Sequence, residues 1–370
     1  MAEKVKTMGK KIAFGDNSNM RFSVIRKVFY TFLHHKIVKR KVFLFSLLFI
    51  LLFLSFLFSF MLGGSRLASG EVFHALFHPH TCGVSQTIVW QVRFPRILLS
   101  LLIGAGLAAC GCVFQGMLRN PLADPYTLGI SGGAALGATL GIVFRLGNSL
   151  GEFSLPGCAF FGAFLCISLV YLVAQRRRFS VPTLILGGVI LSFVFSACVM
   201  LIFAVSESQD VHRTILWLMG DLSWAPASLI KVVAYFIIVG ISLLLFFSRD
   251  LNLLTLGEEK AAHLGLETEL VKKLLFIITS LITGACVAAS GIIGFVGLIV
   301  PHFMRRFTGP DHQILIPASI LGGAIFLSLC DTLARTIIAP LELPVGVITG
   351  ILGGLFFLIF LFRSKGWEIF

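Results

Sequence analysis

Three closely spaced histidines are the residues in this sequence that most readily suggest chemistry. His74, His78 and His80 lie in the segment HALFHPH, and their imidazole nitrogens could ligate a metal ion or haem iron. A histidine cluster in a loop outside the apolar segments is more often simply solvated. We therefore predict no metal, no cofactor and no catalytic residue at this segment.

The eight cysteines form no metal or redox motif. None has a C-x-x-C spacing, and six lie inside apolar segments, where we interpret them as small packing residues: Cys110, Cys112, Cys166, Cys198, Cys286 and Cys330. Cys82 lies in the first loop expected outside, and Cys158 lies near an outer helix end. A disulfide between these two remains an open alternative.

Signals for enzymatic chemistry are missing as well. The phosphate-binding pattern G-x-x-x-x-G-K-[ST] does not occur, and the single Gly-Lys pair, Gly9-Lys10, lies in a polar segment. The apolar segments offer Ser, Thr and Cys without a mid-depth His or Asp to activate them. We therefore predict that the chain is not an enzyme and does not hydrolyse ATP by itself.

The composition indicates a membrane protein. The 370 residues are 57% hydrophobic and only 13% charged, with a mean hydropathy of +0.97. In residues 42–62, 17 of 21 are Leu, Ile, Phe or Val, and their transfer free energies favour membrane insertion by roughly 5 to 10 kcal/mol. A secretory signal has a shorter apolar region, so we predict a retained helix.

The apolar segments predict an all-α integral membrane protein with about ten transmembrane helices. The other nine lie near residues 97–117, 128–144, 157–174, 182–205, 229–247, 271–289, 291–304, 314–333 and 345–362. The predicted domains are a basic cytoplasmic arm, 1–41, and a ten-helix transmembrane domain, 42–365. A cytoplasmic loop, 248–273, interrupts the membrane domain.

The charge distribution predicts the orientation. With both termini in the cytoplasm, 23 of the 30 Lys and Arg residues lie on the inner side, as the positive-inside rule requires. The arm alone holds eleven of them against two acids, which suits contact with anionic lipid. The net charge of +13 therefore needs no nucleic-acid partner.

Two series of glycines spaced four apart predict close helix packing. Residues four apart share a helix face, and glycine there lets another backbone approach: Gly129, Gly133, Gly137 and Gly141, then Gly346, Gly350 and Gly354. Polar breaks such as Asn120-Pro121 and Pro301-His302 accompany them, and irregular backbone at membrane depth survives only where protein or water satisfies it. Ordinary packing is the alternative to a transport path.

Four stretches of this sequence resemble a known family. They are VRFPRILLSLLIGAGLAACGCVFQGMLRNPLADPYTLGISGGAALGA, GIIGFVGLIVPHFMRRFTGPDH, LCDTLART and LELPVGVITGILGGLFF, spread over roughly residues 60–365. They are similar to the FecCD permeases of bacterial ABC importers for iron chelates, haem and vitamin B12. The resemblance implies a dimeric permease in the cytoplasmic membrane, two ATPase subunits and an extracytoplasmic substrate-binding protein. Whether the second permease copy is identical or homologous stays open.

The resemblance also implies roles for particular residues. It places ATPase-coupling helices at Gly257, Glu258, Glu259, Ala261, Leu264, Gly265 and Leu266. It places a cytoplasmic gate at Asn120, Leu122, Phe179 and Ser180, although Asn120 alone need only cap a helix. Binding-protein docking falls to Arg93, Arg96 and Arg335, with the alternatives that these arginines reach to the interface or that Arg335 pairs with Asp331 and Glu342.

The breadth of the family favours an iron chelate, either a ferric siderophore or haem, as the substrate. A cobalamin importer is the main alternative, and His74, His78 and His80 would be reconsidered if haem were carried. A secondary transporter driven by protons or sodium is less favoured, because it would need an ionisable residue well inside a span.

Overall fold

The structure is a computed structural model that describes residues 18–65, 67–78, 83–147, 151–224 and 226–363; for 18–38 it describes the backbone alone. These residues form helices, turns and loops, with no strand among them. Internal contacts divide the chain into two units, residues 1–47 and 48–370. The predicted arm boundary after residue 41 remains a prediction, and residues 1–17 lie outside the described part.

The helices follow one another with short connections. The long ones are α2 (Ser18–Met61), α5 (Phe94–Met117), α6 (Ile130–Val143), α8 (Ser154–Gln175), α9 (Val181–Val205), α11 (Ala227–Phe246), α14 (Thr268–Ser290), α15 (Val296–Thr308), α16 (His312–Thr336) and α17 (Val345–Arg363). The short ones are α3 (Ser69–Phe77), α4 (Val84–Thr87), α10 (Ser208–Leu218), α12 (Ser248–Thr255) and α13 (Glu258–His263). A π-helical segment, η1 (Ile88–Arg93), joins α4 to α5, and 3-10 turns η2 (Pro125–Leu128) and η3 (Gly151–Phe153) precede α6 and α8.

Seven described helices have the length and apolar character needed to cross a membrane. The other three predicted spans are α6 and α15, which have 14 and 13 residues, and α17, which has 19 residues. Backbone breaks shorten two of them. Gly129 has φ 82° at the start of α6, and Gly291 and Phe295, with φ 68° and 69°, bound the unwound segment between α14 and α15. The prediction of about ten helices therefore exceeds the number of full-length spans.

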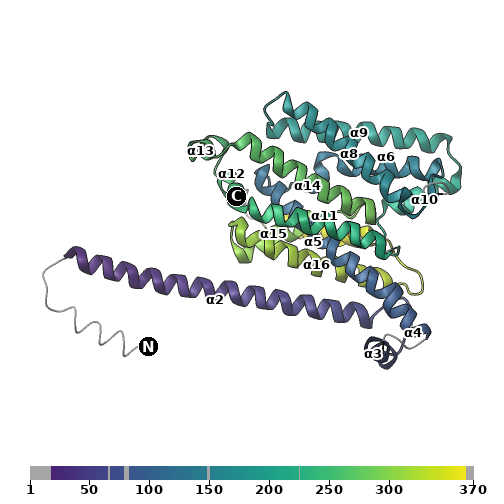
Figure 1. Ribbon diagram of the computed structural model, residues 1–370, viewed down its shortest axis with the longest axis horizontal. Coiled ribbons are helices and arrows are strands. Elements are labelled where there is room, and N and C mark those ends of the chain that lie inside the picture. Colours follow the sequence, from purple (N-terminus) through teal and green to yellow (C-terminus); the bar gives the residue numbers. More distant parts are fainter. Residues whose placement is uncertain (1–17, 66, 79–82, 148–150, 225, 364–370) are drawn as a thin grey trace. The chain divides into compact units, whose positions relative to one another are not determined.

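Helix α5 lies in the core of the second unit. From Ile103 to Met117 its residues are all buried, and it packs along α14, α15 and α16. Small residues permit this: a Cβ at Gly104 would lie 2.2 Å from the carbonyl oxygen of Gly323 in α16. Helices α6, α8 and α9 form a neighbouring group, as Figure 1 shows.

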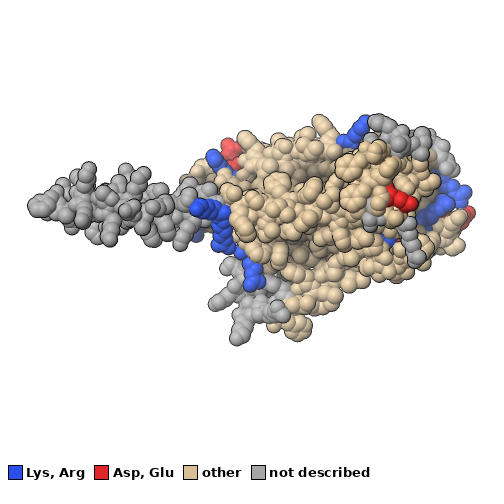
Figure 2. All heavy atoms as spheres, turned by 90° about the horizontal axis from the view of Figure 1, so that it is seen from below, with Lys and Arg blue, Asp and Glu red and all other residues tan. Residues whose placement is uncertain are grey.

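The two ends of the second unit differ in structure. Helices α12 and α13 lie at one end of the bundle and α3 and α4 at the other, in the view of Figure 1. We call these the α13 end and the α4 end. The face seen in Figure 2 is largely uncharged where residues are described. Elsewhere, large apolar side chains of α9 such as Phe193, Met200 and Val205 are exposed. Such a surface suits lipid or another apolar partner.

Candidate functional site

The first glycine series lies against two helices. A Cβ at Gly133 would lie 2.4 Å from the carbonyl oxygen of Gly162, and one at Gly137 would lie 2.1 Å from that of Cys158, both in α8. A Cβ at Gly141 would lie 3.1 Å from the Cys158 Cβ. Gly129 instead faces α9, where a Cβ would lie 2.6 Å from the carbonyl oxygen of Gly188. These distances leave room for hydrogen alone.

The second glycine series differs from the prediction. A Cβ at Gly346 would lie 2.3 Å from the carbonyl oxygen of Met219, so this residue does pack closely. At Gly350 and Gly354 a Cβ would meet no atom within 4 Å. Within the described residues of a single copy, these two glycines thus have no close neighbour on their side of α17, and their packing role stays a prediction.

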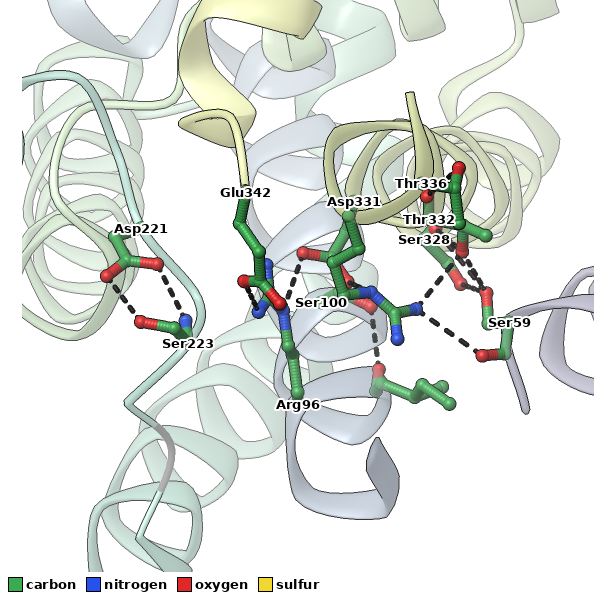
Figure 3. Close-up of polar contacts among 12 residues, drawn as sticks. Ser59, Arg96, Ser100, Asp221, Ser223, Ser328, Asp331, Thr332, Thr336 and Glu342 are labelled. Carbon is green, nitrogen blue, oxygen red and sulfur yellow. Dashed lines mark hydrogen bonds and ion pairs between the residues drawn. The ribbon is translucent and has the colours of Figure 1, made fainter. Parts of the chain in front are cut away.

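A buried charge network joins α5, α16 and the segment before α17 at the α4 end. The Arg96 Nε donates to Asp331 Oδ1 at 2.9 Å, and its Nη1 donates to Glu342 Oε2 (Figure 3). Arg335 Nε forms an ion pair with Asp331 Oδ2 at 3.0 Å, although the angle is not that of a hydrogen bond. The Asp331 carboxylate thus forms ion pairs with two guanidinium groups, those of Arg96 and Arg335.

Arg93 has a different set of partners. Its Nη1 donates to the carbonyl oxygen of Phe60 at 2.6 Å, and its Nη2 donates to the carbonyl oxygen and hydroxyl of Ser65 at 3.0 and 3.1 Å. It therefore satisfies carbonyl groups at the end of α2. Nearby, the Ser59 hydroxyl lies 2.6 Å from the Thr332 hydroxyl, which ties α2 to α16.

The three arginines are more deeply placed than a docking surface requires. Arg93, Arg96 and Arg335 are only 3–4% exposed. They line a pocket of about 160 Å³ together with Gly63, Gly64, Ser65, Ile88, Val92 and Glu342. Arg96 and Arg335 pair with acidic side chains inside the protein, and all three arginines border this pocket. Their docking role stays a prediction.

The residues predicted for the gate have dissimilar surroundings. Asn120 Oδ1 accepts a hydrogen bond from the backbone N–H of Leu122 at 2.9 Å, a local turn, and Leu122 is exposed. Phe179 is fully buried and stacks edge-on with Tyr171 and Phe276. Its side chain therefore belongs to a packed core, and its gate role stays a prediction. The Ser180 hydroxyl pairs with that of Thr183 at 2.6 Å.

The polar break after Asn120 is rigidly organised. Asp124 Oδ1 accepts from the backbone N–H of Tyr126 at 3.1 Å, and the Tyr126 hydroxyl donates to the carbonyl oxygen of Ile293 at 3.1 Å. Burial raises the pKa of Asp124 to about 6, although backbone hydrogen bonds oppose the shift. The loop between α5 and α6 is thus attached to the unwound segment before α15.

The predicted coupling segment forms two short helices, α12 and α13, at the α13 end. Gly257 and Gly265 bound α13 with φ 111° and 89°, values that favour glycine. Ala261 is fully buried, whereas Leu264 is 62% exposed and Glu259 is also exposed. The segment therefore has one face on the bundle and one apolar and acidic face outward.

Two sets of polar contacts that hold this segment in place were not predicted from the sequence. Asn252 of α12 donates to Asp311 Oδ1 and accepts from the backbone N–H of His312, each at 2.8 Å. Lys272 Nζ of α14 donates to Glu258 Oε2 of α13 at 2.7 Å. A lysine just inside a predicted span was the available signal for the second set, because a charge at that depth needs a partner.

The histidine segment offers no complete ligand set in the described residues. The His74 and His78 rings stack with centroids 4.5 Å apart, and His80 lies outside the described part of the chain. No group of three or more His, Cys, Asp or Glu side chains that could hold a metal occurs where side chains are described. Cys158 is a free thiol here, and Cys82 lies outside the described residues.

Comparison with known proteins identifies the protein family to which this chain belongs. Residues 50–363 match the FecCD transport family. The chain belongs to this family. It is 39% identical to the hemin transport system permease protein HmuU of Yersinia pestis over 79% of this chain and 88% of the relative.

Other FecCD relatives are named for different substrates. The iron(3+)-hydroxamate import system permease protein FhuG of Bacillus subtilis is 34% identical, over 86% of this chain and 96% of its own length. The vitamin B12 import system permease protein BtuC of Klebsiella pneumoniae is 38% identical, over 76% and 84%. This FecCD chain is therefore a permease of the ABC importer type.

A solved structure agrees with this assignment. The chain superposes on an inward-facing conformation of a metal-chelate type ABC transporter with a TM-score of 0.75 and 34% identity, covering 87% of this chain and 98% of that one. Together with the seven apolar helices, the likeness identifies this FecCD protein as a multi-pass, all-α membrane protein.

Proposed function

We propose that this chain is the permease subunit of an ATP-driven importer that carries an iron chelate, a ferric siderophore or haem, across the bacterial cytoplasmic membrane. The observation that carries the proposal is the match to the FecCD family over residues 50–363. Relatives named for haem and for ferric hydroxamate support the substrate class. Cobalamin is the second candidate, because BtuC relatives are equally similar.

The proposal includes an assembly around this chain. A second permease copy covers apolar surface such as that of α9 and the open side of Gly350 and Gly354. Two ATPase subunits bind the exposed face of α12 and α13, and both termini lie in the cytoplasm. The exposed Leu264 and Glu259 support this contact, since a mixed apolar and acidic face suits a protein partner.

At the α4 end, a substrate-binding protein docks through its acidic side chains. Asp331 and Glu342 pair with Arg96 and Arg335, and Arg93 lines the same pocket, so the five groups together keep a net charge of +1 when all are ionised. A carboxylate that enters the pocket would complete the pairing of the guanidinium groups. This arrangement supports docking by insertion rather than by contact with freely projecting arginines.

The decisive experiment reconstitutes the chain in liposomes with its ATPase and binding protein. We expect no ATP turnover from the chain alone, because its sequence has no phosphate-binding loop. The complete assembly should hydrolyse ATP faster when supplied with haemin or a ferric hydroxamate than with cyanocobalamin. If cyanocobalamin alone stimulates turnover, cobalamin replaces the iron chelate as the proposed substrate. ATP turnover by the pure chain, or uptake without ATP, would contradict the importer assignment.

A substitution at Gly265 tests the coupling role of α13. Gly265→Val places a β-branched residue at φ 89°, which costs about 1–2 kcal/mol, although no neighbour within 4 Å obstructs the side chain. We expect the variant to insert and bind its outer partner while binding-protein-stimulated ATP hydrolysis falls several-fold. ATPase pull-down and turnover are measured in parallel.

Gly265→Asn is the matched control, because asparagine tolerates a positive φ better than other side chains. It should retain most of the stimulation. Wild-type stimulation and wild-type ATPase binding in Gly265→Val would assign this loop as a connector and place coupling elsewhere.

A further inference from the structure

We propose that Lys272 is a positioning residue that links the coupling helix α13 to the turn between α8 and α9. This inference rests on the proposed ATPase coupling at α13. It concerns a residue that neither the sequence motifs nor the proposed docking and gating roles include. The consequence is that displacement of α13 by an ATPase would act on the start of α9 through one ammonium group.

The contacts of Lys272 join three separate segments. Its side chain is 2% exposed, and Nζ donates to Glu258 Oε2 of α13 at 2.7 Å and to the carbonyl oxygen of Phe179 at 3.0 Å. Lys272 itself belongs to α14, 93 residues beyond Phe179. A single buried charge therefore bridges the coupling helix, a long membrane helix and the turn before α9.

Burial makes the two contacts interdependent. An ammonium group removed from water needs nearly all of its hydrogen bonds satisfied, and loss of one partner leaves a charge without compensation. Glu258 is partly exposed, so its carboxylate can move with α13, whereas the Phe179 carbonyl is fixed in the backbone. If Glu258 moves away, the buried ammonium group of Lys272 keeps only the Phe179 carbonyl oxygen of these two partners. Movement of Glu258 thus changes the hydrogen bond between Lys272 and Phe179.

The turn that receives this contact is a strained one. Arg178 and Phe179 both have φ 52°, which is unusual for residues other than glycine. The Phe179 ring, packed between Tyr171 and Phe276, and the bond from Lys272 hold the turn in place. Backbone strain of this kind persists only where surrounding contacts enforce it, so the turn is a suitable two-state element.

Helix α9 is well placed to respond. It begins at Val181, two residues after Phe179. Leu184 in its first turns is fully buried, and a Cβ at Gly188 would lie 2.5 Å from the Cα of Leu128, so a shift of these turns would be passed on to η2. The strained turn fixes the position of the first residues of α9, and the hydrogen bond from Lys272 helps to hold the turn in its conformation.

The test compares variants in the complete assembly in liposomes, with haemin, a ferric hydroxamate and cyanocobalamin supplied separately. Lys272→Met keeps the aliphatic stem and removes the ammonium group. We expect the ATPase to co-purify at the wild-type level and binding-protein stimulation of ATP turnover to fall by about five-fold or more. Glu258→Gln retains an oxygen acceptor without the charge and should give a smaller loss of stimulation.

Glu269→Gln is the matched control, because it breaks an ion pair of 2.6 Å with Lys273 that stays within α14. It should leave the stimulation ratio close to that of wild type. Equal stimulation ratios for Lys272→Met and Glu269→Gln, at equal ATPase content, would overturn the role of Lys272. If Lys272→Met fails to assemble, the same comparison is made with Glu258→Gln, and a wild-type ratio there overturns it.

Failure of the proposed function has a different signature. A wild-type chain that recruits no ATPase, or whose ATPase does not respond to the binding protein, would contradict the proposed function and this role with it. If the wild-type complex assembles and is stimulated by the binding protein, and Lys272→Met has the same stimulation ratio, only the positioning role of Lys272 is contradicted.

Discussion

Gly137→Leu is expected to reduce the yield of folded permease by more than about ten-fold, the largest effect of any glycine substitution in α6. A Cβ at this position would lie 2.1 Å from the carbonyl oxygen of Cys158 and 2.9 Å from its carbonyl carbon. Both obstructing atoms belong to the backbone of α8, so no rotamer change relieves the overlap, and α6 and α8 must separate. Overpacking of this kind costs about 3 kcal/mol or more.

The measurement is size-exclusion chromatography of the detergent-extracted protein followed by thermal unfolding. Gly157→Leu serves as the control, because Gly157 lies on α8 one residue from the contact, yet a Cβ there meets no atom within 4 Å. We expect this variant to purify like wild type. Equal yields and equal unfolding temperatures for the two variants would show that α6 and α8 are not closely packed.

The contrast between the glycine series shows how far the sequence alone reaches. Spacing of four residues predicts that glycines share one helix face, but it carries no information about what lies opposite that face or where the helix begins. Gly133 and Gly137 meet α8 and Gly129 meets α9, whereas among the described residues no atom lies within 4 Å of a Cβ at Gly350 or Gly354. Long apolar runs predicted the full-length spans well, but the short helices α6 and α15 depend on backbone breaks whose depth hydropathy does not report.

Apart from the pairing of Arg335 with Asp331, four residues away, the partners of the buried charges were beyond the reach of the sequence for a related reason. An arginine near the end of an apolar segment has the same local pattern whether it reaches to the interface or pairs internally. Arg96 and Asp331 are 235 residues apart in the sequence, and Lys272 and Phe179 are 93 apart. Only the fold brings such partners together, so their burial and their carboxylate or carbonyl partners could not be read from spacing.

Asp331→Ala should destabilise the protein strongly, by about 3–5 kcal/mol in the free energy of unfolding. Asp331 is 1% exposed and compensates both Arg96, at 2.9 Å, and Arg335, at 3.0 Å. Its removal would leave two buried guanidinium groups with Glu342 as the nearby carboxylate. Thermal unfolding in detergent, at one fixed salt concentration, measures the loss.

Glu342→Ala is the control for Asp331→Ala, since the Glu342 side chain is 40% exposed and water can replace much of its contact with Arg96. Its loss should cost at most ~1 kcal/mol.

The same variant also separates stability from docking. Reversing the charge of the arginines would disrupt the buried network itself. Glu342→Ala instead raises the positive charge of the pocket and leaves the Asp331 contacts intact. We expect binding-protein association to be stronger in Glu342→Ala, especially at low salt. Wild-type stability in Asp331→Ala would show that the network does not support the fold, and weaker association in Glu342→Ala would contradict docking of an acidic partner in this pocket.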